Sequence, residues 1–466
     1  MRSTWGHLRL GIALAAGKWA GVLSRWLRRG DGTSMPGLVA RRIDPHVLTR
    51  LVADSGVPVI VVTGSNGKTT TGRMLTALLR AEGLDAQSNA SGANLVQGVT
   101  TLAVEAADLR GRLSADVLVA EVDEGTLRQV VPELAPRVVL TLDLFRDQLD
   151  RFGELHAVSD ALEASVRALS PDAVWISNAD DPLLAYLAPE RTERRVTFGL
   201  ELDRSTDRIT SAADSIRCPR CGTDLVYDRV YLSHLGAYAC PACGLHRPSL
   251  DVAVTALELV GIAETRLTVR LPASELVLRI PQAGVHVAYD VAGALAVMVG
   301  LGIAPEHAAV ALAEVRPAFG RLEVAQAGNR RIVLGFVKNP TSYNTTLHAL
   351  ASSDEPKQLL IAASNTPVDG EDFAWLWDVD FGVAAGLLER VTVSGTRADE
   401  LANRLKYAGV DLRSLAVVTD RRRALDLALA GIPPGGQLTI LAGYTPMLEL
   451  RALMYERGWV GRLREA

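Results

Sequence analysis

The chain has 466 residues, of which 48% are hydrophobic and 22% charged, and its formal net charge is −4. These values are typical of a globular protein, and the length predicts two or three domains. The charge balance gives no reason to expect nucleic acid as the main partner, and no run of 18 apolar residues suggests a membrane-spanning helix.

The first 30 residues carry only basic charged side chains: Arg2, Arg9, Lys18, Arg25, Arg28 and Arg29. Apolar residues recur there at helical spacing: Leu8, Ile12, Trp19, Leu23 and Trp26. Two interpretations stay open for this helix, which either packs on the body of the protein or rests on anionic lipid as a basic amphipathic helix. An export signal fits poorly because the apolar run is short. We therefore expect a cytoplasmic protein, peripheral at the inner face of the membrane if the second interpretation holds.

The most informative stretch is Gly64-Ser65-Asn66-Gly67-Lys68-Thr69. An apolar run at 57–63 predicts a buried strand before it, and residues 70–79 predict a helix after it. This arrangement holds phosphate, because loop N–H groups and the helix N-terminus point at oxyanions and a lysine adds positive charge. Val62 stands where the usual pattern has a glycine, so the loop is a shortened variant. We expect ATP or GTP to bind at Gly64, Asn66, Gly67, Lys68, Thr69 and Thr70.

Acidic residues follow the later predicted strands. The run at 115–120 ends in Glu121-Val122-Asp123-Glu124, and the runs at 138–142 and 173–177 end in Asp143 and in Asn178-Ala179-Asp180-Asp181-Pro182. Carboxylates at the end of a buried strand can hold Mg²⁺ opposite a phosphate loop, although they can equally be solvated acids that open a helix. Strands that alternate with helices predict a parallel, doubly wound α/β sheet.

All four cysteines lie in one short window with the spacing C-x₂-C-x₁₈-C-x₂-C: Cys218, Cys221, Cys240 and Cys243. This spacing predicts a zinc site, and four thiolates leave no open position, so the expected role of Zn²⁺ is structural. A pair of disulfides is the competing interpretation, which the lack of an export signal disfavours. Basic and acidic residues balance within the window, which does not favour nucleic-acid binding.

The predicted elements divide the chain into three parts. Residues 1–50 form a basic helical segment, and residues 51–322 form an ATPase domain with a zinc-ribbon insertion near 205–249. Apolar runs in residues 323–466 predict a Rossmann-like α/β domain; they lie at 332–337, 358–363, 390–393 and 437–442.

The stretches TGSNGKTT, AEVDEG, Asp147–Gly153 and SNADDP, in this order, resemble the Mur ligases and the folylpolyglutamate synthases. The chain is more similar to the MurT family of Mur ligases in its short basic N-terminus, residues 145–154, the four-cysteine ribbon and residues 368–378. The resemblance covers nearly the whole chain. It implies a Mur-ligase-type P-loop ATPase domain with a zinc-ribbon insertion, followed by a C-terminal Rossmann-like domain.

The resemblance also implies an activity in peptidoglycan biosynthesis. ATP would phosphorylate the α-carboxyl of D-glutamate in the stem peptide of lipid II, and ammonia from a GatD-type glutamine amidotransferase, the partner in a heterodimer, would convert the acyl phosphate to D-isoglutamine. Thr69 and Glu121 would hold Mg²⁺, with Lys68 beside them in the catalytic group, while Arg321 would touch nucleotide and Lys338 phosphate. A free-standing amino-acid ligase of folylpolyglutamate type is the alternative.

The chain departs from the Mur ligase pattern at several positions. Many members have a histidine where Gln148 stands and a carbamylated lysine near Glu163, so a second Mg²⁺ site is not implied. Val287 and Asp290 replace asparagines near the adenine, whose recognition would then rely on backbone groups or on Asp290. Phe336 stands where related ligases have an aspartate, which weakens the match for the neighbouring lysine.

A glutaminase needs a cysteine nucleophile, and all four cysteines here suit zinc. The nucleophile must therefore come from the partner. A Cys–His pair works best when a third group orients the histidine. The resemblance places this group at Asp372, with Asp369 as the runner-up and Asp378 and Asp380 as weaker candidates. Alternatively, Asp372 only caps a helix that begins near Phe373.

Overall fold

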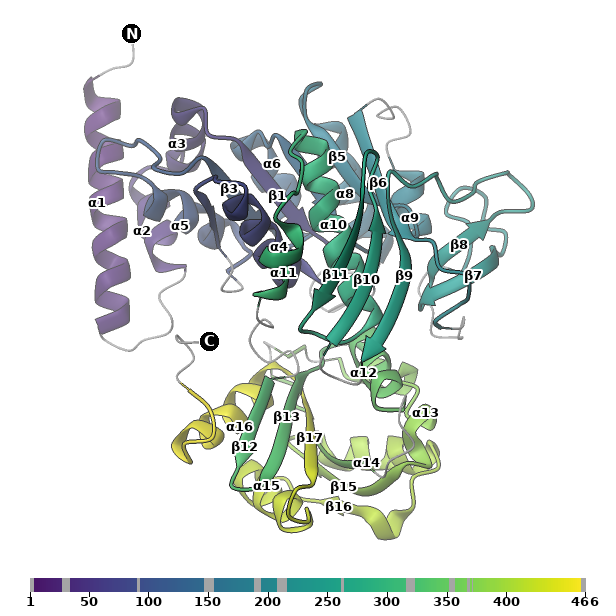
Figure 1. Cartoon of the computed structure of the whole chain (residues 1–466). Helices are drawn as coiled ribbons and strands as arrows, with labels where there is room; N and C mark the ends of the chain where they lie inside the picture. The colour runs from purple at the N-terminus through teal and green to yellow at the C-terminus, as the bar shows by residue number, and fades with distance from the viewer. Residues whose placement is uncertain are drawn as a thin grey trace.

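The structure is a computed structural model that describes residues 4–26, 34–89, 93–145, 155–187, 194–207, 216–260, 264–315, 323–351, 357–366, 369–370 and 372–461. Its strands form two large sheets, one above the other in Figure 1, and a small two-stranded hairpin. The chain completes the larger sheet before it enters the smaller one.

Within the described residues, the larger sheet has nine strands in the order β11-β10-β9-β6-β5-β4-β1-β3-β2. They are β1 (Val59–Thr63), β2 (Ala86–Ser88), β3 (Val117–Glu121), β4 (Val138–Thr141), β5 (Val174–Asn178), β6 (Arg195–Leu200), β9 (Val252–Val260), β10 (Glu264–Arg270) and β11 (Glu275–Ile280). The strands from β2 to β9 in this order pair in parallel, as predicted. The antiparallel pairs β9–β10 and β10–β11 were not predicted, and short connections allow only this pairing.

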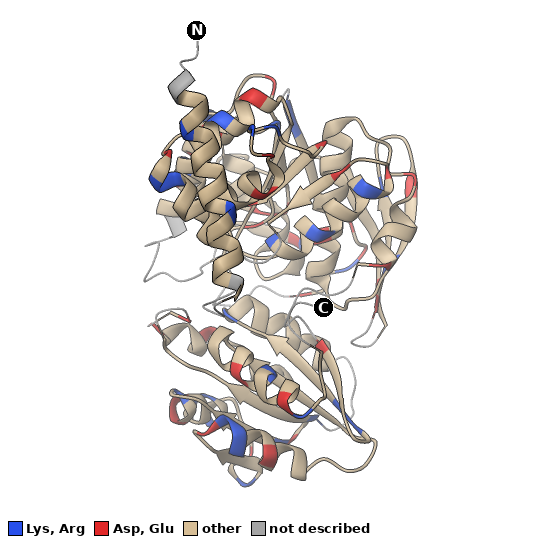
Figure 2. Cartoon of the chain, turned by 90° about the vertical axis from the view of Figure 1, so that its left-hand side faces the viewer, with Lys and Arg blue, Asp and Glu red and all other residues tan. Residues whose placement is uncertain are grey.

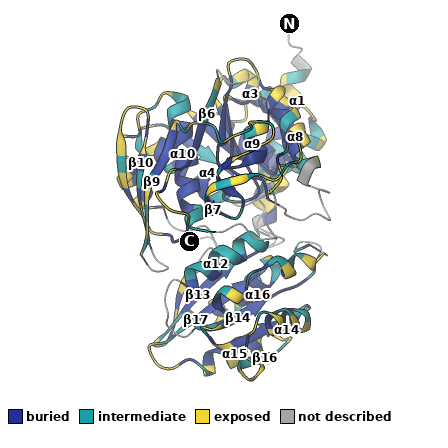
Figure 3. Cartoon of the chain, turned by 90° about the vertical axis from the view of Figure 1, so that its right-hand side faces the viewer, coloured by how far each residue is buried: buried dark blue, intermediate teal, exposed yellow. Residues whose placement is uncertain are grey.

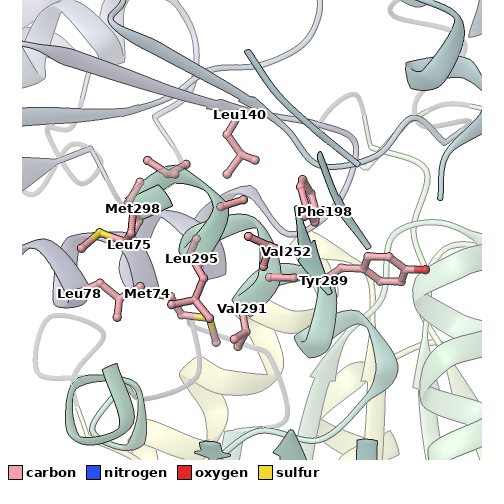
Figure 4. Close-up of a cluster of buried hydrophobic side chains, with 14 of the residues drawn as sticks. Met74, Leu75, Leu78, Leu140, Phe198, Val252, Tyr289, Val291, Leu295 and Met298 are labelled. Carbon is pink, nitrogen blue, oxygen red and sulfur yellow. The ribbon is translucent and has the colours of Figure 1, made fainter. Parts of the chain in front are cut away.

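Helices cover both faces of the larger sheet, and for this reason its central strands are apolar without interruption. On β1, Ile60 and Val62 face one core, while Val59 and Val61 face the other. The first core lies under α4 (Lys68–Ala81), α10 (Val285–Leu301) and α11 (Ala308–Ala313), and Figure 4 shows part of it. The second lies under α3 (Val47–Ser55), α5 (Val96–Ala106), α6 (Leu127–Leu134), α8 (Leu155–Arg167) and α9 (Pro182–Tyr186).

The predicted N-terminal helix exists as α1 (Thr4–Trp26), which packs on α2 (Met35–Ile43) and α5. It packs on the body through Leu10, Ala13 and Leu14, which are buried, and not through the apolar stripe identified in the sequence, which is exposed. Small residues allow the close approach: a Cβ on Gly17 would lie 2.8 Å from the Pro36 carbonyl oxygen. No helix in the described part of the chain is long and apolar enough to cross a membrane.

Within the described residues, the smaller sheet has six strands in the order β12-β13-β17-β14-β15-β16. They are β12 (Glu323–Ala327), β13 (Arg330–Phe336), β14 (Lys357–Ala362), β15 (Leu388–Ser394), β16 (Leu415–Val417) and β17 (Gln437–Ala442). All neighbours pair in parallel except β12 and β13. The flanking helices are α12 (Pro340–Ala351), α13 (Gly382–Ala385), α14 (Ala398–Tyr407), α15 (Arg421–Ala430) and α16 (Tyr444–Glu456), with 3₁₀ turns η2 (Ala374–Asp378) and η3 (Leu412–Ser414).

The four strands predicted for this part correspond to β13, β14, β15 and β17, and the Rossmann-like prediction is confirmed. Separate hydrophobic clusters lie on the two faces of the sheet. Figure 3 shows the central strands of the larger sheet in the colour of buried residues, whereas the outer strands β9 and β10 carry exposed residues.

We expect Gly37→Ala to destabilise the contact between α2 and α5. The new Cβ would lie 2.0 Å from the Gln97 carbonyl oxygen and 2.7 Å from the Thr101 nitrogen, and both are backbone atoms that cannot turn aside. Overpacking of this kind costs about 1–3 kcal/mol of unfolding free energy, which a lower thermal midpoint would report. The control is Gly72→Ala on α4, where no described heavy atom beyond the adjoining backbone of the same helix lies within 4 Å of the added Cβ. Equal midpoints for the two variants would contradict the packing.

Candidate functional site

The phosphate loop lies between β1 and α4, so the predicted strand and helix are confirmed. Gly64 has φ 137° and Gly67 has φ 82°, backbone conformations that residues with a side chain rarely adopt. A Cβ on Gly67 would also lie 2.1 Å from Oδ1 of Asp290, which sits beneath the loop and accepts a hydrogen bond from Thr71. Both glycines are therefore required by the conformation of the loop.

Lys68 is buried at the first position of α4. Its Nζ donates to the carbonyl oxygen of Gly64 and lies 3.0 Å from a carboxylate oxygen of Glu124. Burial alone would favour the neutral amine, but the charges of Glu124, Asp123 and Glu121 outweigh it and hold the pKa of Lys68 above its ordinary value. The lysine is therefore a permanent cation at the loop.

Glu124 carries the matching negative charge. Burial raises its pKa, and the cations Lys68 and Lys338 more than offset this, so that the pKa stays below its usual value. Asp143 has less compensation: burial raises its pKa to about 8, although the backbone N–H of Asn66 donates to its Oδ1 at 2.8 Å. The site holds more carboxylates than cations, a charge balance that suits a divalent metal ion.

Thr69 and Glu121, the two residues predicted as magnesium ligands, lie in direct contact. The Thr69 hydroxyl lies 2.9 and 3.0 Å from the two carboxylate oxygens of Glu121 at the end of β3. Asn89 fixes this strand end, because its Oδ1 accepts from the Glu121 N–H at 2.7 Å and its Nδ2 donates to the Glu121 carbonyl at 2.9 Å. A hydroxyl and a carboxylate at one point are hard oxygen donors that fit Mg²⁺.

The smaller sheet supplies two further residues to the loop from the segment after β13. The Nζ of Lys338 donates to the carbonyl oxygen of Ser65 at 3.1 Å, and Nδ2 of Asn339 donates to Oδ1 of Asn66 at 3.2 Å. The structure therefore brings Lys338 to the phosphate loop, as expected from the resemblance. The sequence carried no signal for Asn339 beyond its position next to this lysine.

Two side chains predicted to bind nucleotide, those of Asn66 and Thr70, have hydrogen-bond donors available. The Nδ2 of Asn66 and the Oγ1 of Thr70 are buried and make no hydrogen bond within the described residues. Buried polar atoms normally have a partner, so these atoms fit a ligand with acceptor oxygens such as a phosphate. Arg321 and the whole Asp147–Gly153 stretch, including Gln148, lie outside the described residues.

The four cysteines come together as predicted. Their Sγ atoms all lie within 4.8 Å of one another, the pairs Cys218–Cys243 and Cys221–Cys240 are 3.5 and 3.4 Å apart, and none forms a disulfide. Sulfur atoms around a tetrahedral zinc ion are about 3.8 Å apart, since Zn–S bonds are about 2.3 Å long. The donor set and its geometry fit Zn²⁺.

Between the two cysteine pairs the chain forms a hairpin of β7 (Val226–Leu232) and β8 (Leu235–Ala239) that enters the core of the larger unit. His234 at its tip is fully buried, with Nε2 3.8 Å from Oδ1 of Asp181 and its ring centroid 4.5 Å from that of Phe145. The N–H of Phe145 donates to the Ser65 hydroxyl at 2.9 Å. The hairpin is thus linked to the phosphate loop through Phe145. The sequence did not predict this link.

Beyond the second cysteine pair, Arg247 fastens the ribbon to the SNADDP stretch. Its guanidinium lies 2.9 Å from Oδ1 of Asp180, and Oδ2 of the same carboxylate accepts from the hydroxyl of Tyr289 at 2.8 Å. Burial raises the pKa of Asp180 to about 6, and the Arg247 charge opposes this rise. Removing the arginine alone would leave a buried carboxylate with less compensation.

The two main candidates for the partner-facing carboxylate, Asp369 and Asp372, differ in their hydrogen bonds and in their exposure to solvent. The Asp369 side chain accepts from the hydroxyls of Ser364 and Thr366 and from the backbone N–H of Thr445, so it holds loops together. Asp372 is exposed, and its Oδ1 accepts from the Ala374 N–H at 2.8 Å at the start of η2. Asp372 thus binds the first N–H of the turn from one position before the N-cap residue, Phe373, and it faces solvent.

Comparisons with known proteins agree with this architecture. Residues 62–225 match the Mur ligase middle domain and residues 336–447 match the MurT ligase C-terminal family. The MurT subunit of lipid II isoglutaminyl synthase (glutamine-hydrolyzing) from Streptococcus pneumoniae R6 is 29% identical over 456 residues, which cover 97% of this chain and 98% of that protein.

Two solved structures share the fold. A pseudomurein peptide ligase type C from Methanothermus fervidus matches with a TM-score of 0.65 at 19% identity, over 86% of this chain and 79% of its own. The MurF ligase from Thermotoga maritima, solved in complex with ADP, matches with a TM-score of 0.62 at 17% identity, over 88% and 82%. The predicted Mur-ligase-type α/β fold is confirmed.

We expect one Zn²⁺ per chain, measured by elemental analysis of the purified protein. Cys240→Ser should lose the metal and lower the thermal midpoint, because a thiolate ligand is removed and the hairpin loses its staple. Thr223→Ala is the matched control, since this hydroxyl accepts from Cys221 but is not a ligand, and it should keep the metal. Protein without zinc, or a native disulfide between these cysteines, would refute the site.

Proposed function

Because this chain belongs to the Mur ligase family and is similar to a MurT subunit along nearly its whole length, we propose that it is the ATP-dependent amide ligase subunit of a lipid II isoglutaminyl synthase. Its reaction is an amidation in peptidoglycan synthesis. The substrate group is the α-carboxyl of D-glutamate in the stem peptide, and the product is D-isoglutamine. The observation that carries the proposal is the convergence of Lys68 and Lys338 on one phosphate loop beside the Thr69–Glu121 pair.

The residues of the site suit this chemistry. Bound ATP would supply the phosphoryl group and Mg²⁺ would offset its charge, with Thr69 and Glu121 as the metal ligands. A substrate carboxylate must approach a triphosphate, and Lys68 and Lys338 reduce the repulsion between these anions. In the reaction a carboxylate oxygen bonds to the γ-phosphorus as ADP departs. Ammonia then bonds to the carbonyl carbon, the C–O bond to phosphate breaks, and the nitrogen gives up a proton to solvent.

The ammonia comes, in this proposal, from a GatD-like glutamine amidotransferase bound to residues 323–466. Exposed Asp372 lies on this part of the chain, and so does an exposed aromatic pair, Trp377 and Tyr407, with ring centroids 5.8 Å apart. Exposed aromatic residues are common anchors of protein interfaces. We propose residues 51–322 as the ATPase domain and residues 1–50 as a helical segment on it, with the whole protein at the inner face of the membrane where its lipid-linked substrate resides.

Lys68→Ala should abolish amidation with free ammonia, and Lys338→Ala should lower its rate by about 10²-fold or more, because each change removes a cation from the phosphate loop. Lys406→Ala, at an exposed lysine of α14, is the control and should keep the wild-type rate. The readout is mass-spectrometric detection of amidated lipid II. A folded Lys68→Ala protein with undiminished rate would contradict the ATP-site assignment.

Asp372→Asn should remove glutamine-driven amidation and leave ammonia-driven amidation intact, because the proposed role of this carboxylate is to orient the partner's histidine. Asp399→Asn, at an exposed aspartate of α14, is the control and should keep both activities. If both activities of Asp372→Asn fall together, the residue serves the ligase site or the fold. If neither falls, the orienting group lies elsewhere.

A further inference from the structure

The outer face of α1 exposes large apolar side chains in one stripe. Trp19 and Trp26 are 73% and 78% exposed. The other members are more than half exposed: Leu8, Ile12 and Leu23. These five residues, which we call the α1 stripe, follow one another at intervals of three, four or seven residues, so they lie along a single line on the helix.

This arrangement differs from that of the usual surface helix, which turns its apolar side inward and its polar side to water. Here the inward side is also apolar, with Leu10, Ala13 and Leu14 buried against the body. The α1 stripe therefore contributes nothing to the described core. Leu109 extends the apolar surface beside the helix: it is exposed, and its carbonyl oxygen would lie 3.6 Å from a Cβ on Gly11.

Basic side chains line the margins of the stripe. Arg9 follows Leu8 and Lys18 precedes Trp19, and each step turns about 100° around the helix, so the two cations lie on opposite sides of the stripe. Each donates to a backbone carbonyl of the body, Arg9 to Ile43 at 2.6 Å and Lys18 to Glu105 at 3.1 Å. The helix contains no acidic residue, and Figure 2, which looks at this side of the molecule, shows it without red.

We infer that the α1 stripe lies in the headgroup region of an anionic bilayer, with α1 parallel to the membrane surface. Tryptophan suits this region because its ring is apolar and its N–H is polar, and long cationic side chains at the margin can reach lipid phosphates. The inference rests on the proposed function in one respect. Contact with the membrane is useful to this protein because its proposed substrate is carried by a lipid.

Charge favours this occupant over a second copy of the chain. Two copies that met through their stripes would bring together two helices that hold cations and no anions. An anionic surface compensates the same cations. The position also leaves the rest of the molecule accessible, since α1 flanks the β2 end of the larger sheet and runs along the outer side of the molecule (Figure 1). Asp372 lies far along the chain, between β14 and η2.

The test is co-sedimentation of the full chain with vesicles of phosphatidylglycerol and phosphatidylcholine, compared with vesicles of phosphatidylcholine alone. Wild-type protein should bind the anionic vesicles more tightly, and binding should weaken with added salt. The double variant Trp19→Asp/Trp26→Asp should lose at least about tenfold in affinity, because it places charge in the stripe. The control is Val277→Asp, at a 72% exposed valine on β11 at the opposite edge of the sheet, which should bind like wild type.

Ammonia-driven amidation of a soluble substrate analogue separates this inference from the proposed function. The double variant should amidate the analogue at the wild-type rate, which also shows that it is folded. Equal vesicle binding by wild type and the double variant would overturn the inference, and so would a wild-type dimer that the double variant dissociates. Vesicle binding as expected, combined with no amidation by any protein, would uphold the inference and overturn the proposed function instead.

Discussion

The whole site depends on the need to compensate buried negative charge around one phosphate loop. Glu121, Asp123 and Glu124 are buried beside it, and their charges raise the pKa of Lys68. Each unpaired charge in such a position costs several kcal/mol, so cations must be near. Lys68 supplies one from the first turn of α4, and Lys338 supplies the second from the other sheet. Electrostatics therefore links the two sheets at the point where the chemistry would occur.

The topology explains why these residues meet. β1, β3 and β4 are neighbours in the parallel sheet, and the carboxyl ends of parallel strands lie at one edge. Ser65, Glu121 and Asp143 each follow or end one of these strands. The loop can approach them closely because Gly64 and Gly67 adopt positive φ, and Asp290 of α10 fills the space under Gly67. Sheet order and two glycines thus assemble a site from segments far apart in the sequence.

Local patterns predicted part of this site well. The strand, the loop and the helix around Lys68 are contiguous, and the cysteine spacing reflects short turns, so both could be recognised without tertiary information. Residues that meet only through tertiary packing could not: Asn89, Asn339 and His234 carry no local signature. Lys338 was located only through the resemblance to a family, since a lysine in a loop after a strand has no distinctive pattern of its own.

The sequence left open, for a related reason, which side of α1 packs on the body. Its sequence contains two apolar stripes, and helical periodicity does not say which one is buried. Glycines decided it, because Gly17 lets the α1 and α2 backbones approach, whereas bulky Trp19 and Trp26 on the other line would hold them apart.

The zinc ribbon is best understood as part of the ATPase core and not as an appended module. Tyr231, Leu232 and Leu235 of its hairpin belong to the same hydrophobic cluster as helices α4 and α10. The cysteine pairs lie at the open end of the hairpin, where Cys221 is exposed, while His234 at the tip packs on Phe145 beside the phosphate loop. A metal at the open end would therefore hold the two strands together and keep the tip in place. An effect of zinc on the nucleotide site would pass along this hairpin or through Arg247, which joins the segment after the second cysteine pair to Asp180.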